Sequence, residues 1–127
     1  TVFIGPCLAK KAEKNEPDIA GAIDYVLTYQ ELRDLLSVTD LKPADMPEDA
    51  QPHASTTGIT YAYAGGVAAA VKRTLEKLNP HRKIKLQTRK ADGVPGCKAM
   101  INDILEGRRD GNFFEGMGCI GGCVGGP

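Results

Sequence analysis

The sequence predicts an α/β domain in which a mostly parallel sheet is flanked by helices. Short apolar runs with strand character alternate along the chain with segments whose apolar residues recur at helical spacing. Such alternation favours parallel βαβ pairing, in which ligands gather beyond the carboxyl ends of the strands. The chain has 127 residues, of which 42% are hydrophobic and 25% charged. These values are typical of one ordinary globular domain, so we expect residues 1–127 to form a single α/β domain.

The first predicted strand is Val2–Ile4, and Gly5-Pro6-Cys7 follows it, so that Cys7 should lie in a loop at the carboxyl end of the strand. After a polar stretch, residues 23–27 predict a second strand. Thr28 should begin a helix, because Glu31 lies at the spacing of a capping box, in which each side chain bonds the other residue's backbone N–H. The buried face of this helix is expected to comprise Leu32, Leu35 and Leu36.

Residues 37–57 show no periodicity and contain three prolines, which predicts a long surface connection. A second amphipathic helix should open at Gly65-Gly66 and end near Asn79-Pro80. Residues 83–90 alternate and predict a strand that could lie at a sheet edge. Pro95 suits the first turn of a third helix that runs until Gly107. Its apolar face would consist of Met100, Ile101, Ile104 and Leu105, and a last short strand is expected at residues 112–115.

The net charge is zero, but eight of the sixteen Lys and Arg residues fall between Lys72 and Lys90, where Glu76 is the one acid. A nucleic-acid surface is one interpretation of this cluster. The solvated face of a helix running into a strand is the other, and we favour it because no aromatic residue interleaves for base stacking. No apolar run is long enough to span a bilayer, and four cysteines without an export signal favour a reducing compartment, so we expect a cytoplasmic location.

The segment 116–127 is rich in glycine and cysteine and carries no charge. Such a run cannot pack a core and costs entropy to order, which suggests that an inorganic ligand holds it. Cys119 and Cys123 could face the same way on one helical turn, and Cys7 could supply a third thiolate. Glycines would let backbone N–H groups approach cluster sulfides, and the absence of nearby carboxylates would spare an anionic iron-sulfur unit from repulsion.

A CxxxC pair is by itself a weak signal, and two buried thiols in a flexible tail are the alternative. Zinc needs four ligands, and His53 and His81 are poorly placed to complete a site. The redox motif CxxC is excluded by the spacing of three residues between Cys119 and Cys123. Cys97 falls near the start of a predicted helix, where we expect it to be a small buried hydrophobe rather than a ligand.

Two motifs resemble a known family. FIGPCLAKKAE, at residues 3–13, and EGMGCIGGCVGG, at residues 115–126, are similar to the second and third cysteine motifs of the iron-only (FeFe) hydrogenases, in the C-terminal domain of the large subunit. Between them, DYVLTYQEL at residues 24–32 and GITYAYAGGVAAAVKR at residues 58–73 resemble further segments of that family. The resemblance covers nearly the whole chain.

The resemblance implies that the chain forms one lobe of an FeFe-hydrogenase catalytic core. The parent would be an oxidoreductase that works under anaerobic conditions and catalyses reversible H2 oxidation and proton reduction. Its cofactor would be a 4Fe-4S cluster linked to a two-iron subcluster, the H-cluster. Cys7 and Cys119 would ligate the cubane, and Cys123 would bridge to the two irons. Lys10 would hydrogen-bond an iron-bound cyanide, and Met117 would pack beside the dithiolate. Pro6 and Gly118 would adjoin these cofactor-binding residues.

The family's first cysteine motif, which carries the fourth cubane ligand, is absent from this sequence. We therefore expect the chain to be a fragment that is inactive alone, with the cofactor absent or incomplete. Its expected partners are the missing N-terminal part of the polypeptide and an electron-transfer protein such as ferredoxin, but no nucleic acid and no membrane span. Two alternatives remain: a non-catalytic 4Fe-4S protein that resembles iron-sulfur assembly factors, and a hydrogen sensor. Tyr61, Ala62 and Ala64 stand where the family usually has Phe, Gly and Thr, which would suit a divergent, sensing branch.

Overall fold

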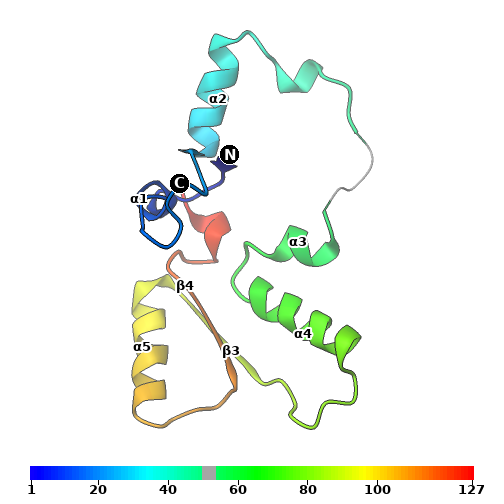
Figure 1. Cartoon of the computed structure of the whole chain (residues 1–127), viewed down its shortest axis with the longest axis vertical. Coiled ribbons are helices and arrows are strands. Elements are labelled where there is room, and N and C mark those ends of the chain that lie inside the picture. The colour runs from blue at the N-terminus through cyan, green and yellow to red at the C-terminus, as the bar shows by residue number, and fades with distance from the viewer. Residues whose placement is uncertain (50–53) are drawn as a thin grey trace. The chain divides into compact units, whose positions relative to one another are not determined.

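The computed structural model describes residues 1–49 and 54–127, which form two compact units (Figure 1). The N-terminal unit consists of Thr1–Gln51 with Gly126–Pro127, and the C-terminal unit consists of Pro52–Gly125. Among the described residues, no helix is both long and apolar enough to cross a membrane.

The N-terminal unit is built on a small βαβ motif. Strand β1 (Val2–Ile4) pairs in parallel with β2 (Tyr25–Leu27), and the short helix α1 (Ala9–Glu13) lies between them in the sequence. The register runs from Val2 opposite Tyr25 to Ile4 opposite Leu27. The first predicted strand is therefore confirmed, and the second is confirmed but begins two residues later than expected. Helix α1 was not predicted, because its five residues are too few to show an apolar period.

Helix α2 (Tyr29–Val38) begins at the capping box that the sequence predicts. The Thr28 hydroxyl accepts a hydrogen bond from the Glu31 N–H at 3.3 Å, and the Thr28 N–H donates to Glu31 Oε2 at 2.8 Å. Thr28 is buried, so its N–H and hydroxyl have little access to water, and these two bonds supply their partners. The expected buried face is only partly right, because Leu35 is 50% exposed.

The stretch expected as a surface connection, residues 37–57, contains the end of α2, a 3-10 turn η1 (Pro43–Asp45) and the first residues of α3 (Thr56–Thr60). All of its described residues are exposed except Thr57, which is half-buried. Residues 50–53, which include Pro52 and His53, lie outside the described residues.

The C-terminal unit contains a second and larger βαβ motif. Strand β3 (Thr88–Asp92) pairs in parallel with β4 (Phe113–Met117), with α5 (Gly93–Leu105) between them in the sequence. The predicted strand at residues 83–90 is wrong at its start, because residues 83–87 are irregular and Ile84 is 75% exposed. Side-chain alternation there reflects a surface segment rather than a pleated strand.

Helices α4 (Gly66–Leu78) and α5 pack on opposite faces of the β3–β4 pair. Glu115 bonds the backbone at the start of α4, whereas a Cβ at the next residue, Gly116, would meet Cys97 and Met100 of α5. Successive strand residues face opposite sides, so the two helices cover different faces. The α/β class, with parallel strands flanked by helices, is therefore confirmed.

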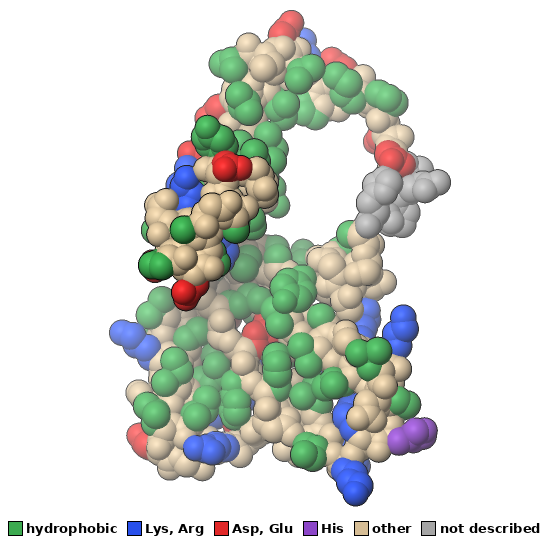
Figure 2. Space-filling view, in the orientation of Figure 1, with side chains coloured by type: hydrophobic (Ala, Val, Ile, Leu, Met, Phe, Trp, Pro, Cys, Tyr) green, Lys and Arg blue, Asp and Glu red, His purple; other side chains and the backbone are tan. Residues whose placement is uncertain are grey.

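The core is small. Val26, Ala68 and Met100 are the buried hydrophobic residues in the described part of the chain. On α5, Ile101 and Leu105 were expected to be buried but are 52% and 78% exposed. Figure 2 shows many hydrophobic side chains on the visible surface of the molecule.

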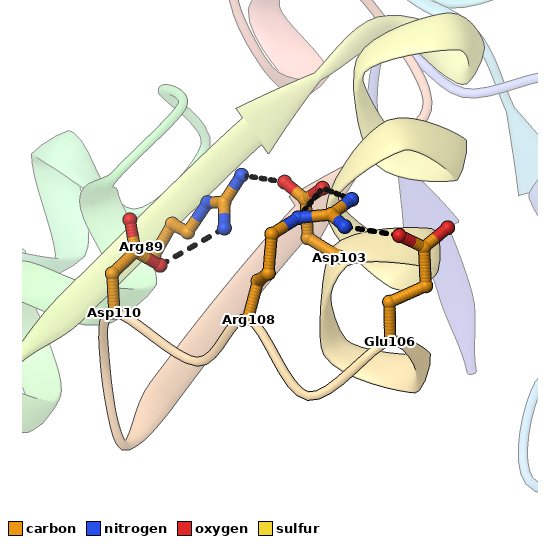
Figure 3. A network of polar contacts seen from close by, with 5 residues as sticks. All are labelled: Arg89, Asp103, Glu106, Arg108 and Asp110. Atoms are coloured by element: carbon orange, nitrogen blue, oxygen red, sulfur yellow. Dashed lines mark hydrogen bonds and ion pairs between the residues drawn. The ribbon is translucent and has the colours of Figure 1, made fainter.

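A network of ion pairs holds the second βαβ motif together at the amino ends of its strands (Figure 3). Arg89 on β3 bonds Asp103 of α5 at 2.5 Å and Asp110, in the turn before β4, at 2.9 Å. Arg108 also bonds Asp103 at 2.5 Å and pairs with Glu106. Arg108 and then Arg89 lower the pKa of Asp103, because both guanidinium groups favour the charged carboxylate.

Candidate functional site

Cys7 lies just beyond the carboxyl end of β1, as the sequence predicts. The Gly5 N–H donates to the Leu27 carbonyl at 3.0 Å, which continues the β1–β2 pairing by one residue. The Cys7 N–H then donates to the Gly5 carbonyl at 2.9 Å, so the chain turns tightly around Pro6. Cys7 and Pro6 are both half-buried. Cys7 therefore lies two residues beyond a paired strand end and not in a long loop.

Lys10, the residue expected to bind a cofactor anion, lies in α1. Its ammonium is 2.5 Å from Glu13 Oε2, and its side chain is 38% exposed. The Lys10 ammonium is thus partly exposed and paired with a carboxylate of its own helix, and its bond to a cofactor anion stays a prediction of the resemblance.

Glu31 connects α1 to the start of α2. The Lys11 ammonium is 2.6 Å from Glu31 Oε1, while Glu31 Oε2 accepts the Thr28 N–H. The bond from Lys11, followed by the bond from the Thr28 backbone, lowers the pKa of Glu31 from 4.5 to about 2. One carboxylate thus fixes the position of α1, which carries Lys10, relative to the helix that follows β2.

The other two predicted ligands lie in the C-terminal unit, in a loop that we call the cysteine loop (Gly118–Cys123). It follows directly from the carboxyl end of β4, where Met117 pairs with Asp92 at the end of β3. The Gly122 N–H donates to the Cys119 carbonyl at 3.1 Å, and a 3-10 turn η2 (Cys123–Gly125) comes next. Cys119 is half-buried and Cys123 is exposed. Both thiols therefore lie at the edge of the sheet where α/β folds bind ligands.

The backbone of residues 62–64 bonds the second half of this loop and the residue after it. The Ala64 N–H donates to the Gly121 carbonyl at 3.0 Å, and the Val124 N–H donates to the Ala62 carbonyl at 3.3 Å. Between these two bonds Gly122 has φ +95°, and a Cβ on it would lie 2.5 Å from the Ala64 nitrogen. Only glycine fits there, so the loop shape depends on a close backbone approach that no larger residue permits.

Glu115 is a buried carboxylate that no sequence pattern singles out. Its two oxygens accept the N–H groups of Gly65 and Ala68, each at 2.8 Å, at the start of α4. The positive end of the helix dipole and these two bonds satisfy the buried charge. Because residues 62–64 come directly before this helix, Glu115 also fixes the backbone that holds the cysteine loop.

A second carboxylate reaches the loop itself. Asp92 Oδ2 accepts the N–H of Gly121, which lies between the two cysteines, at 2.5 Å. The expectation that no carboxylate lies near the loop is therefore wrong. No acid occurs within residues 116–126, but parallel pairing of β3 with β4 brings one from 29 positions earlier. The position of Asp92 directly before Gly93, at a strand-to-helix junction, is the one signal that could have drawn attention to it.

The remaining predicted residues fall around the same strand end. Met117 is half-buried, and Gly118 is exposed, with space around it for a Cβ. Cys97 is half-buried on α5, and its thiol donates to the Met117 carbonyl at 3.3 Å. That contact suits a small packing residue at the helix–strand interface.

The structure thus groups the predicted residues into two sets. Pro6, Cys7 and Lys10 lie together in the N-terminal unit, whereas Met117, Gly118, Cys119 and Cys123 lie together in the C-terminal unit. Among residues 1–49 and 54–127, no three His, Cys, Asp or Glu side chains are grouped so as to hold a metal ion by themselves.

The chain is similar to proteins of known structure. Among the solved structures that match it, three of FeFe-hydrogenases each match over 98% of this chain and 47% of their own. One, described as revealing stepwise H-cluster assembly in HydA(deltaEFG), has TM-score 0.65 and 19% identity. A variant of HydA1 from Chlamydomonas reinhardtii has TM-score 0.64 and 19% identity. A third, concerned with oxygen inactivation and the 2Fe subcluster, has TM-score 0.60 and 17% identity.

These structures show that the chain has the same fold, and that it spans about half the length of the structures that it matches. The family of iron-only hydrogenase large subunits, C-terminal domain, matches residues 1–127. The cysteine motifs and the two parallel βαβ elements that deliver them fall within this match. The chain therefore belongs to the iron-only hydrogenase large-subunit family, as a C-terminal domain.

Proposed function

We propose that the chain forms part of the catalytic core of an FeFe-hydrogenase and helps to bind its active-site iron-sulfur cofactor. The parent protein would catalyse reversible H2 oxidation and proton reduction. The observation that supports this most directly is the cysteine loop, in which hydrogen bonds order Cys119 and Cys123 at the carboxyl end of a parallel strand pair within a family-matched chain.

The residues present suit such a cofactor. Thiolates are the usual ligands of iron-sulfur clusters, and Cys7, Cys119 and Cys123 are free cysteines at strand ends. The loop is shaped by backbone bonds and by glycines, so a cluster could be approached closely by N–H groups. Three thiols are one short of the four that a cubane takes, so the fourth would come from the missing N-terminal part of the parent polypeptide.

The cofactor, when bound, would supply the redox chemistry of hydrogen. In this proposal Cys7 and Cys119 would ligate the 4Fe-4S cubane, and Cys123 would bridge to the two-iron subcluster. Met117 shields the site with a polarizable thioether, while Pro6 and Gly118 line it. Lys10 donates a hydrogen bond to an anionic cofactor ligand, for which its ammonium must turn from Glu13 or be shared with it.

The proposal extends to partners of the parent. The chain spans 47% of the solved structures that it matches, so the rest of the catalytic core would come from sequence outside these residues. Electrons would be exchanged with a small electron-transfer protein such as a ferredoxin. A cytoplasmic location fits the four free cysteines.

The test is hydrogen evolution by the full-length parent, expressed with its maturation factors under anoxic conditions. Cys123→Ala should abolish both turnover and the carbonyl and cyanide infrared bands of the two-iron unit, because the bridging thiolate is lost. Cys97→Ala is the matched control: it removes a thiol of the same unit that bonds the Met117 carbonyl, and it should retain activity. Turnover in Cys123→Ala equal to that of the wild type would contradict the bridging assignment.

A further inference from the structure

Asp92, at the carboxyl end of β3, makes a different hydrogen bond from the one that its position predicts. Asp92 is the N-cap residue of α5, a position at which Asp ordinarily accepts a bond from the first turn of its own helix. Its side chain makes no such capping bond. Instead, Asp92 Oδ2 accepts the Gly121 N–H at 2.5 Å.

We propose that Asp92 is a positioning residue for the cysteine loop, which holds the backbone between Cys119 and Cys123 in the shape that the cofactor requires. The inference rests on the proposed function, because it assigns a role toward the cofactor to a residue outside the cysteine motifs. The Asp92 carboxylate acts on the loop through the Gly121 N–H.

The loop needs such a contact because its glycines make it costly in entropy to hold in one conformation. Gly121 and Gly122 both have positive φ, at +82° and +95°, and glycines lose more conformational entropy on ordering than other residues. Residues 62–64 bond the carbonyl of Gly121, whereas Asp92 bonds its N–H. The same residue is thus held on both of its backbone polar groups, from two separate elements.

A packing contact supports the same junction. A Cβ on Gly93 would lie 3.2 Å from Ile120 Cγ1, so the first residue of α5 lies directly under the loop. Gly93 has φ +68°, a conformation that turns the chain sharply between β3 and α5. The turn leaves the Asp92 carboxylate beside the loop rather than over the helix end.

The register of the sheet explains why Asp92 is the residue that reaches the loop. Asp92 is paired with Met117, the last residue of β4, and the loop begins at the next position. A shift of one residue in β3 would turn this side chain to the other face. The hydrogen bond therefore couples correct strand pairing to the shape of the ligand loop.

The experiment uses the full-length parent, with Asp92→Ala and Asp92→Asn compared with wild type. Asparagine keeps an oxygen acceptor and removes the charge, whereas alanine removes both. Glu76→Ala is the control, because Glu76 is an exposed carboxylate on α4. Two readouts are taken: deuterium uptake of a peptide covering residues 118–124 in the cofactor-free protein, and the rate at which the reconstituted protein loses iron to a chelator.

In Asp92→Ala the loop should exchange deuterium about tenfold faster and the protein should lose iron faster, as expected when a hydrogen bond to the loop is removed. Asp92→Asn should stay close to wild type in both readouts. Equal exchange and iron-loss rates in Asp92→Ala and wild type would overturn the inference. Rates that rise equally in Asp92→Ala and Asp92→Asn would also overturn it, since they would indicate an effect of charge rather than of the hydrogen bond. A wild-type parent that binds no cluster would refute the proposed function, while the exchange rates would still decide the role of Asp92.

Discussion

Glu31 shows how one side chain can serve two helices. Its two oxygens bond the Lys11 ammonium and the Thr28 N–H, so the residue both caps α2 and attaches α1. The sequence predicts the capping half of this role from a spacing of three residues. The other half depends on Lys11, which lies 20 positions earlier and comes close only when β1 and β2 pair.

This arrangement predicts a specific dependence of stability on pH. The pKa of Glu31 is about 2 in the folded chain against an ordinary value of 4.5. Its stabilising contribution is therefore fully present above pH 4.5 and is lost as the pH falls toward 2. Glu31→Gln should lower the midpoint of urea unfolding of the chain at neutral pH. Between pH 4.5 and pH 2 that midpoint should fall less in the variant than in the wild type.

Lys11→Met supplies the matched comparison, since it removes the largest cause of the shift and leaves the capping box in place. It should flatten the same part of the profile by a smaller amount. A Glu31→Gln profile that falls as steeply as wild type would contradict the assignment.

At the scale of elements, α4 is capped by a residue of another element. Its N-cap is Gly65, which has no side chain, and its first turn contains no acid. The N–H groups at a helix start need acceptors, and here Glu115 of β4 supplies them to Gly65 and Ala68. The helix and the strand are thus joined by polar bonds as well as by packing.

We expect Glu115→Ala to destabilise the chain by about 2–4 kcal/mol, because it leaves the N–H of the buried Ala68 without an acceptor. Glu115→Gln keeps one oxygen acceptor and should cost less. Urea unfolding followed by circular dichroism measures both, with Glu76→Ala on the exposed face of α4 as the control. A loss in Glu115→Ala that matches the control would contradict this account.

At the scale of the whole molecule, much apolar surface is exposed. Val26, Ala68 and Met100 are the buried hydrophobic side chains among the described residues, while Leu78 and Leu105 are 75% and 78% exposed. Figure 2 shows such side chains across the visible surface. Large contiguous apolar areas are unusual on an independent globular protein and mark interaction surfaces.

We therefore expect the isolated chain to bind the hydrophobic dye ANS strongly, and the full-length parent to bind much less of it per mole. In the proposed catalytic core, sequence outside these residues would pack on this surface. Fluorescence titration of both proteins at equal concentration is the measurement. Equal binding would indicate that the exposed side chains remain exposed in the parent.

The sequence by itself determined the fold class, the strand ends that carry the cysteines and the capping box of α2. These are local patterns: an apolar run that ends in Gly5-Pro6-Cys7, a Thr and a Glu three residues apart, and a glycine-rich segment with two cysteines. Physical causes that act within a few residues leave a trace in the order of those residues. The family resemblance rests on the same short motifs.

Only the tertiary structure decided what holds the cysteine loop. Asp92 lies 29 positions from Gly121, and Glu115 lies 47 positions from Ala68. Neither contact leaves a local pattern, because each depends on how β3, β4 and α4 are brought together. The start of β3 and the exposure of Leu35 and Ile101 were mispredicted for the same reason. Burial and long-range hydrogen bonds are properties of the packed chain, whereas periodicity reports only which side of an element is apolar.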